Sequence, residues 1–485
     1  MLELGFAGAM ELALGIRERR VSAADLVEVM LDRVGRLNPP LNAIVTLDAE
    51  GARRRAAEAD AALARGELWG ALHGVPVTFK DAFETAGLRT TSSYAPLAGY
   101  VPTRDATVVA RLRQAGAIVL GKTNMPQLAS DNQSDSPLFG RANNPWDVAR
   151  TPGGSSGGEA AAVSAGLSPL GTGSDMGGSL RLPAHFCGVL ALKPTEHRVS
   201  NAGHIPPLPD TIGTVRYMAV NGPLARTVAD LRLWLTLVAG PDGRDSDVPP
   251  AILGEVPARP LRDLRLAWTD DLGGLPVAQD TQAALMALAK AAEAGGATVE
   301  RTWPRDLDVE RSLRTLGELY GAMIHTAQPR FAQLAMRTIG PLMFRDAVFG
   351  GAIHGMGYGA RDLLLALARR DEVRHCVESF LSGYDAWLCP VAAVSAFPHR
   401  TRGRPQVPLA VDGQRVSGTL ATMGHTGLFS LTGHPVVVLP LARPEGSLPI
   451  GVQVVGRLWG EMDLLAVAQA LTELTGPPRH PAGCD

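Results

Sequence analysis

The chain has 485 residues, and its 46 Lys and Arg nearly balance its 48 Asp and Glu, which leaves a formal net charge of −2 at pH 7. This balance argues against nucleic acid as a partner, because phosphates select strongly basic surfaces. Hydrophobic residues make up 46% and charged residues 19%, a composition that is typical of a globular protein with a large core.

The four cysteines contain no Cys-x-x-Cys pair. The sequence therefore predicts neither a disulfide framework nor a cysteine zinc site, and we expect no metal and no other cofactor. The amino-terminal segment is acidic where a secretory signal is basic, and no run of about 18 apolar residues suggests a membrane segment. We expect a soluble, cytoplasmic protein. Its assembly state stays open, a homodimer included.

The predicted elements begin with helices in residues 1–70. Ser22 caps a run with apolar positions at helical spacing, and residues 52–68 form a second, charged helix. From residue 74 onward short apolar runs alternate with helical segments, which is typical of a largely parallel sheet covered by helices. The expected strands are 75–79, 117–120, 264–268, 297–302, 387–389, 436–439 and 451–455, and the expected helices are 107–115, 280–294 and 461–474.

Residues 305–382 are different in composition, because Leu, Met, Ala and Phe recur there at helical spacing. Most such stripes pack against a core, but an insertion of this kind also suits the wall of a substrate pocket. We predict a helical, pocket-lining insertion here. Within it, Gly355-x-Gly357-x-x-Ala360 fits the pattern of a dinucleotide loop, but no strand precedes it, so we predict no nucleotide site.

Lysine is rare in this chain, since only Lys80, Lys122, Lys193 and Lys290 occur among the 46 basic residues. A buried lysine loses its proton readily, whereas arginine does not. Lys80 directly follows the apolar run 75–79, where burial would lower its proton affinity. We therefore interpret Lys80 as a candidate base, and Lys122 and Lys193 as structural.

Two glycine-rich turns, at residues 151–158 and 171–179, carry serines. Consecutive glycines let several backbone N–H groups converge on a phosphate or on a developing oxyanion. Neither turn ends in the Gly-Lys-Ser/Thr of a phosphate loop. An oxyanion hole beside Ser179 fits better, with Ser179 placed to attack a carbonyl. His185 lies nearby in the sequence, but its register favours helix packing over a role as base.

These motifs together resemble the amidase signature family. The resemblance lies in Gly-Gly-Ser-Ser-Gly-Gly around Ser155, in Gly-Ser-Asp-Met-Gly-Gly-Ser-Leu-Arg around Ser179, and in Gly-Val-Pro-Val-Thr-Phe-Lys-Asp around Lys80. It extends to Gly121-Lys-Thr-Asn-Met-Pro and Gly451-Val-Gln-Val-Val-Gly, and so covers nearly the whole chain. It implies one α/β domain over residues 1–485, with a mixed, twisted central sheet covered by helices on both faces and a signature core at 74–230.

The resemblance also implies the roles of individual residues. Ser179 would be the nucleophile, Ser155 a bridging serine after a cis peptide bond, and Lys80 the base. The remaining implied residues are the backbone amides of Met176, Gly177, Gly178 and Ser179 as oxyanion hole, Asp175 and Arg181 as supports, and Met125, Gln127 and Leu128 as substrate contacts. The implied reaction is hydrolysis of a linear, non-peptide amide, with an apolar acyl or aryl group and some esterase activity.

The chain departs from the family pattern in ways that bear on function. Glu159 and the run Met-Pro-Gln after Asn124 differ from the amidase-type component of the glutaminyl-tRNA amidotransferase and favour a free-standing, fatty acid amide hydrolase-like amidase. Ser430 stands where relatives commonly carry asparagine. Two alternatives stay open: an amidotransferase component that needs a partner, and an α/β-hydrolase esterase in which Ser156 is the nucleophile of a Gly-x-Ser-x-Gly elbow.

Overall fold

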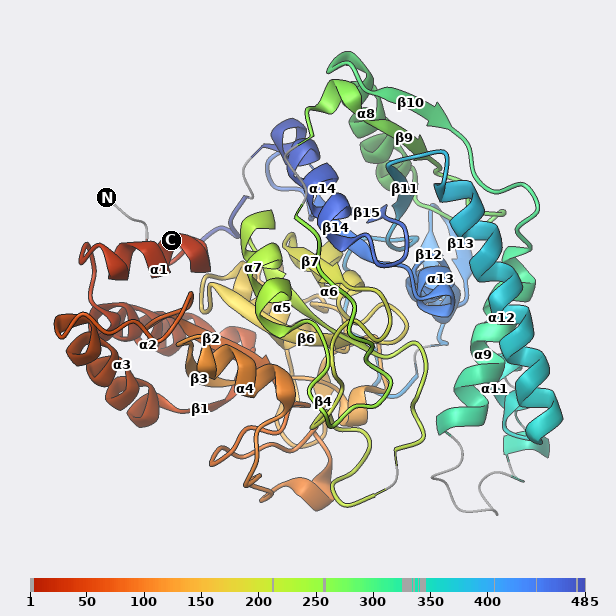
Figure 1. Cartoon of the computed structure of the whole chain (residues 1–485). Helices are drawn as coiled ribbons and strands as arrows, with labels where there is room; N and C mark the ends of the chain where they lie inside the picture. Colours follow the sequence, from red (N-terminus) through yellow and green to blue (C-terminus); the bar gives the residue numbers. More distant parts are fainter. Residues whose placement is uncertain are drawn as a thin grey trace.

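A computed structural model describes the chain except for residues 1–3, 212, 256–258, 325–333, 335, 339, 341–345, 405, 442, 477–478 and 485. Its centre is an 11-stranded sheet with the order β1-β3-β2-β6-β8-β7-β14-β15-β11-β9-β10, covered by helices (Figure 1). The strands are β1 (Ile44–Leu47), β2 (Pro76–Lys80), β3 (Ile118–Thr123), β6 (Leu170–Asp175), β7 (Leu190–Lys193), β8 (Val220–Ala225), β9 (Arg265–Trp268), β10 (Thr298–Arg301), β11 (Ala386–Pro390), β14 (Val436–Pro440) and β15 (Gly451–Val455).

Helices and two small hairpins complete the described fold. The helices are α1 (Ala9–Arg17), α2 (Ala23–Leu41), α3 (Ala49–Ala64), α4 (Thr107–Gln114), α5 (Gly157–Ser164), α6 (Arg181–Cys187), α7 (Val228–Val238), α8 (Gln279–Ala294), α9 (Val309–Ile324), α11 (Ala347–Gly355), α12 (Ala360–Leu381), α13 (Gly418–Thr432) and α14 (Glu461–Thr475). The hairpins pair β4 (Asp135–Ser136) with β5 (Gly140–Arg141), and β12 (Leu409–Val411) with β13 (Gln414–Val416).

The sheet is mixed, as the resemblance implies, and the expectation of a largely parallel sheet is wrong. Parallel pairing joins β2 to β3 and β6, and β9 to β10 and β11. The central strands β6, β8, β7, β14 and β15 pair antiparallel. The parallel neighbours β2 and β3 are linked through α4, whereas β8 follows a long loop and returns between β6 and β7. Loop connections of this kind leave no periodic signal in the sequence.

The helices expected in the first 70 residues are present, but they are interrupted by β1. The Ser22 hydroxyl caps α2 by accepting a hydrogen bond of 2.9 Å from the Asp25 amide. After α2, the four residues of β1 pair antiparallel with β3 at the sheet edge. A strand of this length carries too few alternations to stand out between two helices.

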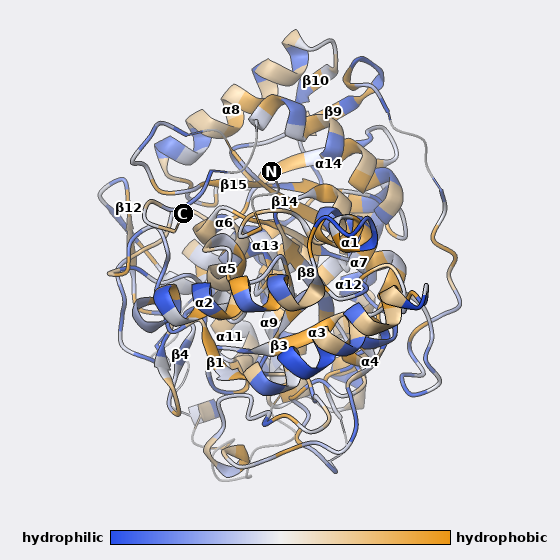
Figure 2. Ribbon diagram, turned by 90° about the vertical axis from the view of Figure 1, so that its left-hand side faces the viewer, coloured by the Kyte–Doolittle hydropathy of each residue, from blue (hydrophilic) through white to orange (hydrophobic). Residues whose placement is uncertain are grey.

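Buried apolar side chains fill both sides of the sheet. One cluster packs the strands against α1, α2, α7 and α14, and a second packs α9, α12 and α13 against the β11 end of the sheet. Figure 2 shows the hydrophobic character concentrated in the strands and on the inner faces of the helices. The second cluster fixes the position of α9, which matters for the site below.

The helical segment predicted at residues 305–382 is present in its described parts as α9, α11 and α12, which lie side by side next to α13 (Figure 1). Residues 325–333, 335, 339 and 341–345 of that prediction lie outside the described residues. Gly321 lies so close to α11 that a Cβ there would collide with the carbonyl of Ala352. Small residues therefore let α9 and α11 pack backbone to backbone.

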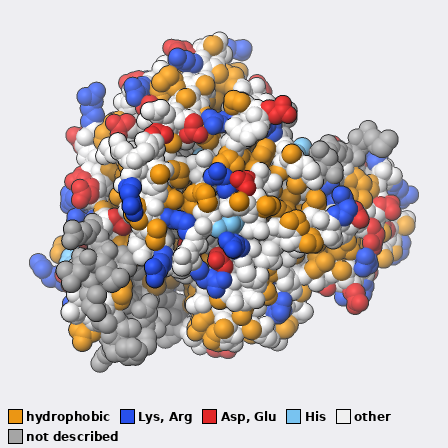
Figure 3. Space-filling view, turned by 180° about the vertical axis from the view of Figure 1, so that it is seen from behind, with side chains coloured by type: hydrophobic (Ala, Val, Ile, Leu, Met, Phe, Trp, Pro, Cys, Tyr) orange, Lys and Arg blue, Asp and Glu red, His pale blue; other side chains and the backbone are white. Residues whose placement is uncertain are grey.

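The described surface mixes charges of both signs. On the face in Figure 3, Arg and Lys side chains alternate with Asp and Glu side chains, in line with the net charge of −2. Among the described helices, none combines the length and the apolar character that a membrane crossing requires.

Candidate active site

Lys80 is the last residue of β2, and its amine lies at the edge where the parallel strands β2 and β6 end. The side chain is fully buried, and its Nζ lies 2.7 Å from Ser155 Oγ and 2.9 Å from Ser174 Oγ. Burial lowers the pKa of Lys80 to about 7, against an opposing effect of the Asp175 and Glu159 carboxylates. A substantial fraction of the amine is therefore neutral near pH 7, as a base requires.

Ser155 and Ser179 come from the two glycine-rich turns. The peptide bond between Gly154 and Ser155 is cis, and Ser155 lies just before α5. The Ser179 carbonyl accepts a hydrogen bond of 3.1 Å from the Ser156 amide, which ties the second turn to the first. The structure thus brings Lys80 into direct contact with Ser155, and it places the backbone of Ser179 against the residue that follows Ser155.

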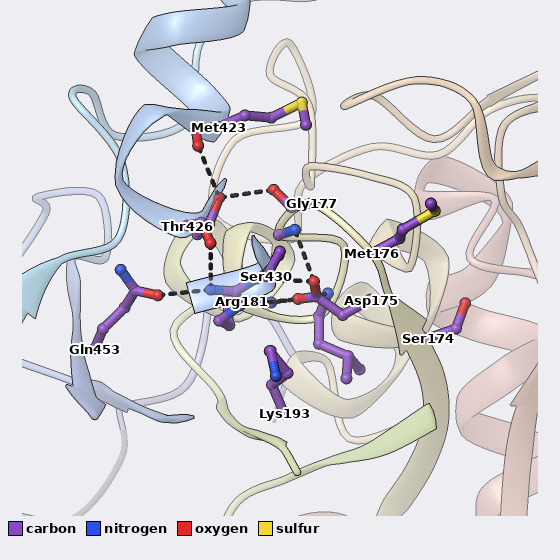
Figure 4. Close-up of polar contacts among 12 residues, drawn as sticks. Ser174, Asp175, Met176, Gly177, Arg181, Lys193, Met423, Thr426, Ser430 and Gln453 are labelled. Atoms are coloured by element: carbon purple, nitrogen blue, oxygen red, sulfur yellow. Dashed lines mark hydrogen bonds and ion pairs between the residues drawn. The ribbon is translucent and has the colours of Figure 1, made fainter. Parts of the chain in front are cut away.

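The turn before Ser179 is held from its carbonyl side. The hydroxyl of Tyr320, on α9, donates to the Met176 carbonyl, and the hydroxyl of Thr426, on α13, donates to the Gly177 carbonyl at 2.7 Å (Figure 4). Carbonyls held in this way fix the orientation of the intervening peptide groups. Two helices that are distant in sequence therefore shape the candidate oxyanion hole.

The amides of this turn differ in their availability. The Gly178 amide donates to the Asp175 carboxylate at 2.7 Å. No described residue accepts a hydrogen bond from the amides of Met176, Gly177 or Ser179. These three N–H groups are available to a ligand oxygen, whereas the N–H of Gly178, which the resemblance places in the same group, is engaged by Asp175.

Asp175 and Arg181 form a fully buried ion pair of 2.9 Å beneath the turn (Figure 4). Burial alone would raise the pKa of Asp175, but the Arg181 guanidinium outweighs this effect and lowers the pKa to about 2. Arg181 also donates to the Thr426 carbonyl at 2.9 Å, to Gln453 Oε1 at 2.9 Å and to Ser430 Oγ at 2.7 Å. Ser430, where the chain departs from the family pattern, is thus a hydrogen-bond partner of the supporting arginine.

We expect Arg181→Met to lower the free energy of unfolding by about 3–5 kcal/mol, because it leaves the Asp175 carboxylate buried without its partner. Chemical denaturation would measure this loss. Arg311→Met is the matched control, because Arg311 pairs with Glu372 at 3.3 Å on the exposed surface, where a pair contributes less than about 1 kcal/mol. Equal losses for the two variants would contradict a structural role for the buried pair.

Glu159, on α5, is a buried carboxyl group near the candidate base. It accepts hydrogen bonds from the hydroxyls of Thr78, on β2, and Thr123, on β3, the second at 2.7 Å. Burial raises the pKa of Glu159 to about 7. The sequence marks this residue only as a departure from a relative's motif. The structure places it where its charge acts on Lys80.

His185 and the other two buried lysines are held by hydrogen bonds away from Ser155. His185 Nδ1 accepts from the Gly451 amide at 2.7 Å, and burial lowers the pKa of the ring to about 4. Lys122 Nζ donates to Thr85 and Thr90 at 3.0 Å each. Lys193 Nζ donates to two backbone carbonyls, at 3.0 and 2.8 Å. In the described part of the chain, no cluster of His, Cys, Asp or Glu could hold a metal ion.

A cavity of about 280 Å³ opens beside Ser179. Its walls come from the turn around Met176 and from α9, α11 and α13, with Tyr320, Ile324, Phe349 and Met423 among the lining side chains. Most of the described lining is apolar, and Asp131 and Asn132 add polar groups on one side.

The three predicted substrate contacts do not line this cavity. Met125 is fully buried, with Sδ 4.0 Å from Ser92 Oγ, and Gln127 is exposed on the surface. Leu128 is half-buried. The cavity wall starts one residue later, at Ala129. The short 3₁₀ turn Gln127–Ala129 redirects the chain at this point, so proximity in sequence did not translate into a position at the cavity.

Two residues that sequence reasoning missed complete the polar surroundings of Lys80. Ser174 lies on β6, and its Oγ contacts both Lys80 Nζ and, at 2.9 Å, His204 Nε2. Ser174 directly precedes Asp175, so its place at a strand end was a usable signal. His204 belongs to the loop between β7 and β8, and nothing in the local sequence connects it with Lys80.

Comparisons with known proteins find similarity along nearly the whole chain. The family model described as Amidase matches residues 25–465. The A-type component of the glutamyl-tRNA(Gln) amidotransferase of Moorella thermoacetica is 33% identical, over 98% of each chain. The structure of 6-aminohexanoate cyclic dimer hydrolase complexed with substrate covers 100% of both chains at 26% identity, with a TM-score of 0.81. Fatty acid amide hydrolase, at 22% identity, has the same fold, with a TM-score of 0.81 over 98% of this chain and 86% of its own.

The chain therefore belongs to the amidase signature family. It is an enzyme of the class that cleaves the C–N bonds of amides.

Proposed function

We propose that the protein hydrolyses linear carboxylic amides other than peptides, through an acyl-enzyme on Ser179. The observation that carries this proposal is the 2.7 Å contact between the desolvated Lys80 amine and Ser155 Oγ. This contact lies beside a cavity that Ser179 lines together with Met176 and Gly177. A base, a relay hydroxyl and donors for an oxyanion thus occur together.

The proposed reaction has two steps. In the first, neutral Lys80 takes the proton of Ser155 while Ser155 takes the proton of Ser179, and Ser179 Oγ attacks the amide carbonyl. The N–H groups of Met176, Gly177 and Ser179 stabilise the oxyanion. The proton then returns through Ser155 to the leaving nitrogen, and the amine or ammonia departs. In the second step water, activated by the same relay, hydrolyses the ester and releases the carboxylate.

The cavity supports an apolar acyl or aryl group in the substrate. Its described walls include Ile324, Phe349 and Met423, whose contacts with a hydrocarbon chain remove apolar surface from water. An ester with the same acyl group would form the same acyl-enzyme, so we propose esterase activity as a side reaction. We place the protein with the free-standing, fatty acid amide hydrolase-like amidases, because Glu159 and Met125-Pro-Gln differ from the amidotransferase motif.

One observation favours a second candidate. The curated relatives include the A-type components of glutamyl-tRNA(Gln) amidotransferases, at 31–34% identity over almost the whole chain. In this alternative the chain would release ammonia only together with a partner protein. The esterase alternative has less support, because Ser156 is fully buried, and its hydroxyl donates to the Ser174 carbonyl at 3.1 Å.

We expect the purified chain to release ammonia or amine steadily from simple amides, with a kcat/KM that increases with the length of an apolar acyl group until the cavity is filled. A panel of acyl lengths and leaving amines, assayed by product release, would measure this. Turnover that requires a partner protein would instead support the amidotransferase alternative. A preference for short, polar acyl groups would contradict the proposed substrate class.

A further inference from the structure

The neutral form of Lys80 needs a defined orientation to act as a base. An uncharged amine has two N–H bonds and one lone pair, and only the lone pair can take a proton. Lys80 Nζ has two hydroxyl neighbours, Ser155 Oγ at 2.7 Å and Ser174 Oγ at 2.9 Å. Either hydroxyl could donate to the lone pair. Catalysis requires that Ser155 donates and that Ser174 does not.

His204 determines the direction of the Ser174 hydroxyl. His204 Nδ1 lies 3.1 Å from the Pro206 carbonyl, and its Nε2 lies 2.9 Å from Ser174 Oγ. A carbonyl only accepts hydrogen bonds, so Nδ1 carries the proton. Burial, together with the positive charge of Lys80, lowers the pKa of His204 to about 4, so the ring is neutral at pH 7. Nε2 is then an acceptor, and Ser174 donates its proton to it.

We propose that His204 is a positioning residue that, through Ser174, turns the lone pair of the Lys80 amine toward Ser155; this inference rests on the proposed function. Because Ser174 donates to His204, it presents only lone pairs to Lys80. Lys80 must then direct an N–H bond at Ser174, which leaves its lone pair for the proton of Ser155. Without His204, the Ser174 hydroxyl would be free to donate to Lys80 and block the base.

The fold holds His204 in place from the segment that follows Lys80. The Ile205 amide donates to the Ala82 carbonyl at 2.7 Å, and the Glu84 amide donates to the Gly203 carbonyl at 2.9 Å. The imidazole also meets the Phe83 ring edge to face, with the ring centroids 5.2 Å apart. The loop that carries His204 is therefore registered against the same stretch of chain that carries the base.

The test compares two replacements of His204. His204→Phe keeps an aromatic ring against Phe83 but removes the acceptor, and His204→Gln removes the ring but keeps an acceptor at a similar reach. We expect kcat of the Phe variant to fall by about 10- to 100-fold, a part of the usual contribution of a general base, while KM stays close to that of the wild type. The Gln variant should recover most of this loss. A role in packing alone would give the opposite order.

A double-mutant cycle with Ser174→Ala tests whether the effect passes through Ser174. Because both changes act on one pathway, adding His204→Phe to Ser174→Ala should lower kcat by less than about threefold further. Thermal unfolding would report whether each variant is folded. A Phe variant within about threefold of wild-type kcat, a Gln variant no better than Phe, or fully additive losses would each overturn the inference.

The rate at which a fluorophosphonate probe labels Ser179 provides a readout that does not depend on the amide substrate. We expect labelling by the His204 variants to slow in the same order as kcat. If the wild type is labelled but hydrolyses no amide, the proposed function fails while the labelling rates still decide the role of His204. If amide hydrolysis requires Lys80 and Ser179 but is indifferent to His204→Phe, the proposed function stands and this inference fails.

Discussion

Replacing Ser179 with alanine is expected to lower kcat for amide hydrolysis by on the order of 10⁶-fold, the size of loss seen when a serine nucleophile is removed. The variant has no oxygen to form the acyl-enzyme, although the amides of Met176 and Gly177 can still hold a substrate carbonyl. Steady-state kinetics on a chromogenic anilide would measure kcat. KM should change little, because the walls of the cavity are unaltered.

Ser164→Ala is the matched control for this variant. Ser164 lies on α5 and donates to the Cys187 carbonyl at 2.7 Å, and it does not line the cavity. We expect this variant to keep wild-type turnover and to be labelled by a fluorophosphonate at Ser179. Labelling of Ser156 in the Ser179→Ala variant, with turnover preserved, would contradict the proposed nucleophile and favour the esterase elbow.

The second large effect is expected at Lys80, where Lys80→Met should lower kcat/KM by on the order of 10⁴-fold, because it removes the proposed general base. Methionine keeps an apolar side chain of similar length in the buried site but has no amine. Lys290→Met, on the exposed face of α8, is the control for the loss of a positive charge. Turnover by Lys80→Met within a few-fold of wild type would show that another group accepts the proton.

The pH profile of the wild type should carry the signature of the same lysine. The pKa of Lys80 is lowered to about 7 by burial, and the neutral form is the base. We therefore expect kcat/KM to fall about tenfold per pH unit below pH 7 and to reach a plateau above it. The charged or titratable groups that act on Lys80 from neighbouring elements are Asp175 on β6, Glu159 on α5 and His204 in the loop before β8.

Glu159→Gln should move this profile in a defined direction. The Glu159 carboxylate raises the pKa of Lys80, so removing its charge lowers that pKa further and shifts the acidic limb to lower pH. Glutamine retains a side chain that Thr78 and Thr123 can bind. A profile that stays in place, or that shifts to higher pH, would argue that a group other than Lys80 determines the acidic limb.

Local sequence signals predicted the parts of the fold that repeat a pattern. Amphipathic α2 and α8 have a helical period, and the strands β2, β14 and β15 are short apolar runs. The directions of the central strands were not predictable in this way. The strand β8 lies between β6 and β7 although it follows both in sequence, and strand order depends on pairings between distant segments.

The same division applies to the candidate site. Lys80, Ser155 and Ser179 stand in motifs whose residue types are tied to their chemistry: a lysine at a buried strand end, and serines in glycine-rich turns. Met125, Gln127 and Leu128 were chosen for proximity along the chain, and the structure places none of them at the cavity. The residues that do line it, such as Tyr320 and Met423, come from helices that are far away in sequence.

The sequence by itself determined the family, the α/β class and the three residues proposed to carry the reaction, because backbone turns and side-chain chemistry are encoded within a few neighbouring residues. Only the tertiary structure decided which groups surround those residues. Glu159 reaches Thr78 and Thr123, and His204 reaches Ser174. These contacts join segments separated by tens of residues, and they exist only after the sheet has brought the strand ends together and excluded water from the lysine between them.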